Sequence, residues 1–473
     1  MNKPLITSLA MATALFVSGC ATLVPTVPEA APSVASEWPL PPTTALAAGT
    51  AADSAAGLPV ADIGWRDFFV DPNLEELVAR ALDNNRDLRV AVLNVEKARA
   101  QYRIQRADRL PSLGANATLE RSGGDLLVSE SYSAGVGIAE FELDLFGRVR
   151  NLSHAALQRY FAQEETRRGA QLSLIAEVAN VYLTLAADQE QLRLAQATLK
   201  THEASYALTA KRHEIGAVSA LDLSQARTQV EGARAETARF AGQVAQDTNA
   251  LNLLVGAPVE AGLLPTGIDD QVTGLGALPA ELPSEVLLRR PDVLAAEHQL
   301  LAANANIGVA RAAFFPSISL TGSVGSASDE LSGLFGGGNK LWSFIPQLNL
   351  PIFQGRRLRA SLGMATADRD IALAQYEKSI QSGFREVADA LALTATLAEQ
   401  REARQAFVDA ATHAEELSRA RYEAGSDSYL VLLDAQRTLY AAQQILITIR
   451  LAEQANRVTL YKVLGGGWHE HNA

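Results

Sequence analysis

Few residues of this chain have the types and spacing that catalysis requires. The 473-residue sequence has one cysteine, which excludes an internal disulfide and any Cys-x-x-Cys metal or redox site. It contains no Gly-x-Ser-x-Gly nucleophile motif. The glycine-rich segment 333–340 misses the Gly-x-x-x-x-Gly-Lys spacing of a phosphate loop, because Asn339 separates Gly338 from Lys340. The sequence therefore predicts neither an enzyme nor a metal or other cofactor site.

Two histidines near the carboxyl end are the remaining candidate metal ligands. His469 and His471 flank Glu470 within the last residues, 469–473. Such a short polar terminus is more typical of a frayed tail than of a metal site. We expect a tail without a bound metal.

The one residue with a predicted modification is Cys20. Lys3 supplies a positive charge and residues 5–17 form an apolar stretch, which is the layout of a secretory signal. The sequence Val17-Ser18-Gly19-Cys20 resembles the bacterial lipobox, after which the signal, residues 1–19, is removed and the cysteine is lipidated. The covalent lipid would be the only attached group. A signal peptide with an incidental cysteine is the alternative.

The residues after Cys20 indicate where the anchored chain resides. Ala21 takes the place of the Asp that favours retention at the inner membrane, so we expect the periplasmic face of the outer membrane. A multiply acylated cysteine anchors a protein there far better than a single chain does. Residues 20–64 are rich in Pro, Ala, Thr and Ser, which predicts an extended lipidated tether.

The composition limits the remaining functions. Lys plus Arg number 41 and Asp plus Glu number 53, giving a net charge of −12. This balance argues against a nucleic-acid partner, since phosphate binding needs a basic face. Beyond residue 20 no run approaches the ~18 uncharged apolar residues of a membrane helix. The mature chain is therefore either soluble or meets the membrane by another route.

The chain contains two tandem copies of one unit. Arg212-His213-Glu214-Ile215-Gly216 matches Arg421-Tyr422-Glu423-Ala424-Gly425 at a shift of 209 residues. Earlier parts match at a shift of 205, as in Pro111-Ser112 and Pro316-Ser317. Chance similarity between alanine-rich helices would not keep its register across breaks at Gly and Pro. We assign repeat 1 to 65–265, a linker to 266–283 and repeat 2 to 284–468.

Each repeat has the same predicted order of elements. Repeat 1 is expected to hold a helix over about 73–108, strands over about 112–121 and 132–145, a long helix over 148–213, a turn over 214–219 and a return helix over 220–255. Repeat 2 is expected to hold a helix over about 284–313, strands over about 316–325 and 341–353, a long helix over 356–423, a turn over 424–428 and a return helix over 429–464.

Two periodicities support these elements. Apolar residues alternate with Gly, Ser, Thr and Asn in the strands, as in Leu113 to Glu120, which is the period of a sheet with two different faces. In the first long helix Val178, Leu185, Leu192 and Leu199 fall seven residues apart. A sustained heptad indicates coiled-coil packing in helices of ~100 Å.

Together these elements predict an α+β membrane protein. Strands of ~10 residues with one apolar face have the length and pattern of membrane-spanning strands. A soluble sandwich is the alternative, but the helices are already committed to coiled-coil seams. An open four-stranded sheet cannot lie in lipid with unpaired edges, so it must close with strands of other chains. Three chains would give a twelve-stranded barrel, and the helices a periplasmic tunnel.

Several segments resemble the TolC/OprM family of outer-membrane efflux channels. These are the lipobox, the duplication, Tyr422-Glu423-Ala424-Gly425, Leu433-Asp434-Ala435-Gln436-Arg437 and the ending Leu464-Gly465-Gly466-Gly467-Trp468. The resemblance covers about Trp65 to Trp468 and is to the lipoprotein branch. It implies a homotrimer in the outer membrane that couples to a periplasmic adaptor and an inner-membrane pump, often of the RND type, to expel drugs, solvents, dyes or metals.

The resemblance also implies a channel gate. Leu430 and Asp434 match the apolar and acidic constriction positions of the family. A ring of leucines can block a pore by dewetting, and a ring of carboxylates attracts cations. Arg437, one turn further, could pair with Asp434. A core leucine and a solvated carboxylate are the plainer alternatives.

The two turns are the expected adaptor-contacting tips. They contain Gly216 and Ser219 in repeat 1 and Gly425 and Ser428 in repeat 2. Glycine at positive φ followed by a serine helix cap would explain them without an adaptor. Two other functions stay open at this point: the exit channel of a type I protein-secretion system, and a periplasmic coiled-coil lipoprotein with a spacer or binding role.

Overall fold

The computed structural model describes residues 23–32, 34–35, 38, 63–124, 128–268, 284–467 and 470. The predicted signal, Cys20, most of the tether, most of the linker and both tail histidines lie outside these residues. The chain divides into two compact units, and each takes parts of both repeats. Unit 1 comprises Met1–Pro32, Leu93–Glu165 and Leu294–Ser379, and unit 2 comprises Ser33–Val92, Thr166–Val293 and Ile380–Ala473.

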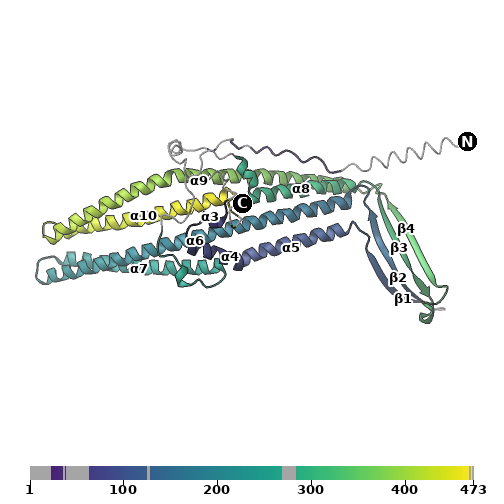
Figure 1. Ribbon diagram of the computed structural model, residues 1–473, viewed down its shortest axis with the longest axis horizontal. Coiled ribbons are helices and arrows are strands. Elements are labelled where there is room, and N and C mark those ends of the chain that lie inside the picture. Colours follow the sequence, from purple (N-terminus) through teal and green to yellow (C-terminus); the bar gives the residue numbers. More distant parts are fainter. Residues whose placement is uncertain are drawn as a thin grey trace. The chain divides into compact units, whose positions relative to one another are not determined.

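Unit 1 contains one antiparallel sheet whose strand order follows the chain (Figure 1). Its strands are β1 (Leu113–Gly123), β2 (Val128–Leu143), β3 (Ser317–Ser328) and β4 (Lys340–Asn349). Among the described residues, β1 and β4 each have one edge without a partner strand. Neighbouring strands come from different repeats only at the β2–β3 pair.

Several predicted strand limits are wrong. The second strand begins at Val128 rather than 132, and the third ends at Ser328 rather than 325. The second strand was expected to reach residue 145 but ends at Leu143, because the Asp144 carboxylate accepts hydrogen bonds from the backbone N–H groups of Val149 (3.0 Å) and Arg150 (2.7 Å) and starts the next helix. The fourth strand was expected to reach residue 353 but ends at Asn349, two residues before Pro351.

The strand register confirms the predicted two-faced sheet. Ala115, Val136, Val324 and Trp342 form one cross-strand row on the apolar face. The adjacent row, on the opposite face, comprises Gly114, Gly137, Ser323 and Ser343. In that polar row the hydroxyls of Ser323 and Ser343 lie 2.7 Å apart.

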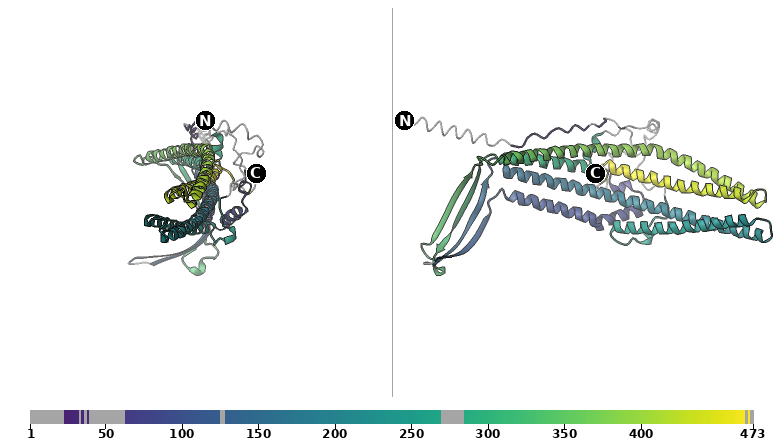
Figure 2. Two further views of the ribbon diagram at one scale, coloured as in Figure 1. Left: turned by 90° about the vertical axis from the view of Figure 1, so that its left-hand side faces the viewer. Right: turned by 180° about the vertical axis from the view of Figure 1, so that it is seen from behind.

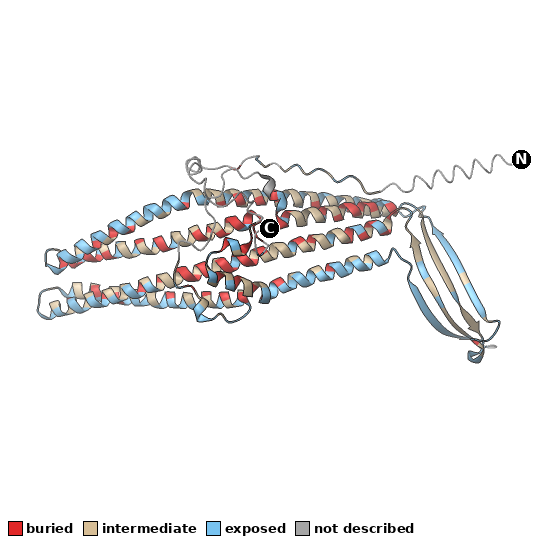
Figure 3. Cartoon of the chain, viewed as in Figure 1, coloured by how far each residue is buried: buried red, intermediate tan, exposed pale blue. Residues whose placement is uncertain are grey.

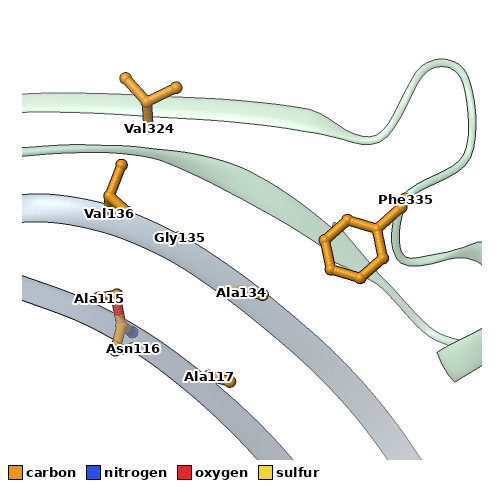
Figure 4. Close-up of a pocket in the computed structure, with 8 residues that line it drawn as sticks. All are labelled: Ala115, Asn116, Ala117, Ala134, Gly135, Val136, Val324 and Phe335. Atoms are coloured by element: carbon orange, nitrogen blue, oxygen red, sulfur yellow. The ribbon is translucent and has the colours of Figure 1, made fainter.

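The apolar face of the sheet is uncovered. Trp342 is 75% exposed and Phe344 is 62% exposed, and Figure 3 shows the strands mostly in the colours of exposed and intermediate residues. A shallow hollow of about 510 Å³ on this face is bounded by small side chains and by the ring of Phe335 (Figure 4). An apolar face of this kind contradicts a soluble sandwich and fits contact with lipid.

A β-bulge in β2, which the sequence analysis missed, keeps the apolar and polar residues on their separate faces of the sheet. The register with β3 shifts between Ile138 and Phe141, and Glu140 has φ of 48°. Its backbone N–H donates to Thr321 Oγ1 at 3.3 Å. The extra residue returns Phe141 and Leu143 to the apolar face. The change of hydrophobic phase from even to odd numbers after Ile138 was the available signal.

Long helices follow each strand pair. They are α6 (Arg148–Glu214) with return helix α7 (Ala220–Val255), and α9 (Arg357–Glu423) with return helix α10 (Tyr429–Val463). The shorter ones are α3 (Trp65–Phe68), α4 (Pro72–Asn84), α5 (Arg86–Ala107), α8 (Pro291–Ala312) and the 3₁₀ helices η3 (Ala261–Leu263), η4 (Ser284–Arg289) and η5 (Leu331–Gly333). One window of α6 is apolar enough for a membrane span, but 61% of it is buried, as packing between helices requires.

The first helix predicted in each repeat is in fact broken. The helix expected over 73–108 is interrupted at Asn85, whose extended backbone follows α4. The Asn85 amide caps α5 by accepting from Leu88 N–H at 2.9 Å and donates to Leu254 O at 2.9 Å. The helix expected over 284–313 breaks at Arg290, because Pro291 excludes helical geometry from the residue before it. Asn85 and Arg290 are equivalent at the 205-residue shift.

The core of unit 2 joins the start of repeat 1 to the end of repeat 2. Phe68 stacks on Tyr461 with ring centroids 3.8 Å apart, and the Tyr461 hydroxyl donates to Ile63 O at 2.8 Å. Gly467 closes over this tyrosine, since a Cβ there would lie 1.4 Å from its hydroxyl. A Cβ on Gly466 would also lie 2.6 Å from the Tyr461 ring, so these two glycines serve packing.

The polar face of the sheet provides the first prediction. A Cβ on Gly137 would lie 2.6 Å from Gly322 O and 2.9 Å from Ser323 Cβ, whereas a Cβ on Gly114 in the same row would meet no atom within 4 Å. We expect Gly137→Val to lower sheet stability by about 1–3 kcal/mol, as overpacking does. Loss of heat-modifiable bands on electrophoresis measures this, and Gly114→Val is the control. An equal loss of these bands in the two variants would contradict the close packing around Gly137.

Candidate constriction and tips of the helical hairpins

The turn between α6 and α7 is closed by its own backbone and by a capping box. Gly216 has φ of 75°, a conformation that glycine adopts without strain. Ser219 caps α7: its hydroxyl accepts from Asp222 N–H at 3.1 Å, and the Asp222 carboxylate accepts from Ser219 N–H at 3.2 Å. The Ser-x-x-Asp spacing was the sequence signal for this cap.

The turn between α9 and α10 is closed differently. Gly425 also has φ of 75°, but the Ser428 side chain makes no capping hydrogen bond. Instead the Arg421 guanidinium donates to both carboxylate oxygens of Asp427, at 2.7 and 3.0 Å. This pairing holds the pKa of Asp427 below its usual value. The sequence analysis did not single out either residue.

The two hairpins lie side by side within unit 2 (Figures 1 and 2). Arg212 is the repeat-1 counterpart of Arg421. The position of its carboxylate partner Asp427 is occupied in repeat 1 by Val218. The Arg212 guanidinium therefore crosses to the second hairpin, 4.9 Å from the ring centre of Tyr422, and donates to Glu423 O at 3.4 Å. A small apolar core joins the same helices, consisting of Ala226, Tyr422, Tyr429, Leu432 and Leu433, with Tyr206 against it.

The predicted gate residues lie on the first turns of α10. Leu430 and Asp434 are four residues apart, hence on one helix face, and both side chains are exposed, Leu430 by 60%. Tyr429 and Leu433, which precede Leu430 and Asp434 in the chain, are both buried. The exposure of Leu430 rules out the core-leucine alternative within the chain, and its role in a constriction stays a prediction.

The expected pairing of Arg437 with Asp434 is wrong. In the described part of the chain Arg437 instead donates from Nε to Gln229 Oε1 of α7 at 3.3 Å. Arg437 thus faces the first hairpin, where burial, together with the positive charge of Arg437, lowers the pKa of His202. Asp434 itself is exposed, and among the described residues its carboxylate makes no ion pair.

A pair of carboxyl groups between α6 and α7 was also missed by the sequence analysis. Burial raises the pKa of Asp188 to about 6, and the facing Asp247 carboxyl adds to this, while Arg239 opposes it. Gln243 Nε2 donates to Asp247 Oδ1 at 3.3 Å. The two residues are 59 positions apart, so periodicity alone could not bring them together.

Comparison with known proteins fits these features. The family described as outer membrane efflux protein matches the chain twice, at residues 77–257 and 282–466. The chain belongs to the outer membrane efflux protein family. The double match also confirms the internal duplication.

Three similar proteins represent the family. The chain is 48% identical to the toluene efflux pump outer membrane protein TtgC of Pseudomonas putida, over 99% of this chain and 97% of that one. It is 45% identical to outer membrane protein OprJ of Pseudomonas aeruginosa, over 99% and 98%. The open-state structure of the MtrE outer membrane channel of Neisseria gonorrhoeae matches with a TM-score of 0.86 and 41% identity, over 96% of this chain and all of that one.

This efflux channel is therefore an outer-membrane protein with the α+β channel fold, as the sequence predicted. The family is one of channels, in line with a chain for which the sequence suggests no catalytic site.

The Asp188–Asp247 pair predicts a pH-dependent stability. The folded pKa of Asp188, about 6, lies above its ordinary value of 3.8, so the folded chain binds more protons than the unfolded chain between these values. The contribution of this carboxyl pair to stability should therefore be fully present below pH ~4 and be lost as the pH rises through ~6. We expect Asp188→Asn to raise stability at pH 7 by about 1–2 kcal/mol, after allowance for solvent screening, and to change little at pH 4.

Thermal unfolding midpoints at the two pH values measure this difference, with Asp389→Asn, which removes an exposed carboxylate of α9, as control. A stabilisation of Asp188→Asn that is the same at both pH values would contradict the raised pKa.

Proposed function

We propose that this efflux channel is a homotrimeric exit duct whose three four-stranded sheets close into a twelve-stranded barrel. The observation that carries the proposal is the sheet, which has one exposed apolar face and two unpartnered edges among the described residues. Each unsatisfied backbone group in hydrocarbon costs several kcal/mol, so edge strands of neighbouring chains must pair. The glycine and serine row then faces a wet lumen, as porin interiors do.

The long helices supply the periplasmic part of the duct. α6 and α9 each have 67 residues, ~100 Å at the rise of an α-helix. Helices of this length are long enough to carry the lumen well into the periplasm. A spacer or binding lipoprotein is a weaker reading, because it leaves the exposed apolar sheet without a role.

The partners proposed for this duct are a periplasmic adaptor and an inner-membrane pump of the RND type. The chain itself supplies no energy source, so direction and selectivity come from those partners. TtgC is a toluene efflux pump outer membrane protein, which supports small organic solvents and drugs as the exported class. It favours this role over a type I protein-secretion channel.

Two further assignments belong to the same proposal. Cys20 carries the lipid that anchors the chain beside its barrel. Leu430 and Asp434 of the three chains form an apolar ring and an acidic ring at the periplasmic constriction, and Arg437 braces α10 against α7 behind them through Gln229.

The constriction is tested by single-channel current in planar bilayers. We expect Leu430→Ala with Asp434→Ala to raise the conductance several-fold, because the dewetting leucines and the cation-binding carboxylates are both removed. The control replaces Leu417 and Asp409, an exposed leucine and aspartate of α9, with Ala. A pore whose conductance the gate variant leaves unchanged would place the constriction elsewhere.

The adaptor contact is tested by photo-crosslinking in cells. A crosslinking residue at Ser219 or Ser428, each beside a tip glycine, should capture the adaptor. One at Gln400, exposed on α9 more than twenty residues before the Gly425 turn, should not. Capture at Gln400 alone would contradict docking at the tips.

A further inference from the structure

Three arginines follow the last strand without an acidic partner. Arg356, Arg357 and Arg359 lie where β4 leads into α9, and all three are exposed. No acidic residue occurs over 331–367, and among the described residues none of the three forms an ion pair. The Arg357 guanidinium donates to the neutral Gln354 Oε1. We call the three arginines the basic junction, a concentration of positive charge in a chain whose net charge is −12.

The first of these arginines has a backbone conformation that suits glycine. Arg356 has φ of 67°, and its repeat-1 counterpart at the 209-residue shift is Gly147, with φ of 73°. A residue with a side chain is disfavoured in this conformation. Such residues persist mainly where the side chain has a use. The exchange of glycine for arginine therefore indicates a role for this guanidinium in repeat 2.

The same shift pairs arginines in the first turn of both long helices. Arg357 and Arg359 correspond to Arg148 and Arg150 of α6. A cation at this end of a helix is unfavourable, because the amino end of the helix dipole is positive. In repeat 1 a carboxylate offsets this cost, since Arg148 Nε donates to Glu142 Oε1 at 2.8 Å. Repeat 2 has no acid nearby, so an anion for the basic junction has to come from outside the chain.

The basic junction adjoins the exposed apolar surface of the sheet. Leu348, near the end of β4, is 65% exposed, and Ile352 and Phe353, which follow the strand, are 90% and 89% exposed. The apolar surface thus continues to within three residues of Arg356 and then becomes basic. Apolar and aromatic side chains followed at once by arginines are typical of a segment that crosses from hydrocarbon to the headgroup level.

We propose that the basic junction binds the headgroup phosphates of anionic phospholipids in the periplasmic leaflet of the outer membrane. A guanidinium can hold a phosphate through two parallel N–H donors, and basic residues beside a membrane are attracted by its anionic lipids. The inference rests on the barrel of the proposed function, because lipid around the sheet is what brings headgroups to this level.

Closure of the barrel would add a second basic segment to each site. The edge strands are β1, which begins shortly after Arg106 and Arg109, and β4, which ends shortly before Arg356. Pairing β4 of one chain with β1 of the next would bring these two segments together. Only one acid, Asp108, lies between Arg106 and Arg109. The two segments would therefore repel one another, and an anionic headgroup between them would offset the repulsion.

Lipid selectivity is tested by native mass spectrometry of purified trimers in detergent. With dioctanoyl phosphatidylglycerol and dioctanoyl phosphatidylcholine at equal concentration, we expect the parent to retain roughly fivefold more of the anionic lipid, or above. Arg356→Gly combined with Arg357→Gln and Arg359→Gln should abolish this preference. The control replaces three exposed cations further along α9 with Gln and should keep it; these are Lys378, Arg385 and Arg404.

Three results would overturn the inference. The first is equal retention of the two lipids by the parent, and the second is a preference that the triple variant keeps. The third is displacement of the phosphatidylglycerol by inorganic phosphate at the same concentration, which would show a phosphate site without a lipid surface. Selective retention of lipopolysaccharide in place of phosphatidylglycerol would contradict the assignment to the periplasmic leaflet.

The single variant Arg356→Gly separates lipid binding from folding. It installs the repeat-1 residue at a positive φ, so its thermal midpoint in lipid-free detergent should at least equal that of the parent. Its preference for phosphatidylglycerol should nevertheless fall about twofold or more. An unchanged preference would contradict the role of this guanidinium.

Single-channel current in neutral bilayers checks the proposed function separately. A parent that conducts but shows no lipid preference would contradict the basic junction alone. A parent that forms no pore would contradict the proposed duct, and with it the barrel on which the inference rests.

Discussion

Unpaired backbone groups at the edges of a lipid-exposed sheet are the constraint on which this architecture depends. Water competes for the N–H and C=O groups of an edge strand in a soluble protein, but hydrocarbon offers no partner. The sheet of this chain exposes Trp342 and Phe344 on one face and ends in two open edges, so it is incomplete as a monomer. Closure with the strands of neighbouring chains follows from satisfying those edges.

Curvature imposes a second requirement on the same sheet. In a small barrel the side chains of the inner face converge, and the inner row here contains glycines where a methyl group would collide with the neighbouring strand, as at Gly137 and Gly325. The bulge at Glu140 then lets β2 bend without turning Phe141 inward. The small inner residues and the phase change in the apolar pattern therefore both allow the sheet to curve while its apolar face is kept.

Period-based reasoning predicted the elements well and their interruptions poorly. Alternation and heptads depend on many residues each, so the four strands and four long helices were predictable. The breaks at Asn85 and Arg290, the bulge, and the Arg421–Asp427 pair each depend on one or two side chains that meet distant partners. Asp188 and Asp247 show the same limit: each helix looks ordinary alone, and only the packing of α6 on α7 makes the pair unusual.

Duplication supplied one scaffold twice, and the differences between the copies identify where function was added. The repeat-1 counterparts of Leu430 and Asp434 are Leu221 and Gln225, so in the proposed constriction each chain would contribute a leucine from both hairpins but a carboxylate from only one. Three carboxylates around an axis repel one another less than six would, yet still attract cations. Likewise Asp427 binds Arg421 within the second hairpin. Its repeat-1 counterpart Val218 cannot bind Arg212, which contacts the second hairpin instead. The two hairpins are therefore joined unequally: the Arg421–Asp427 pair closes the second hairpin on itself, and Arg212 of the first hairpin reaches across to the second.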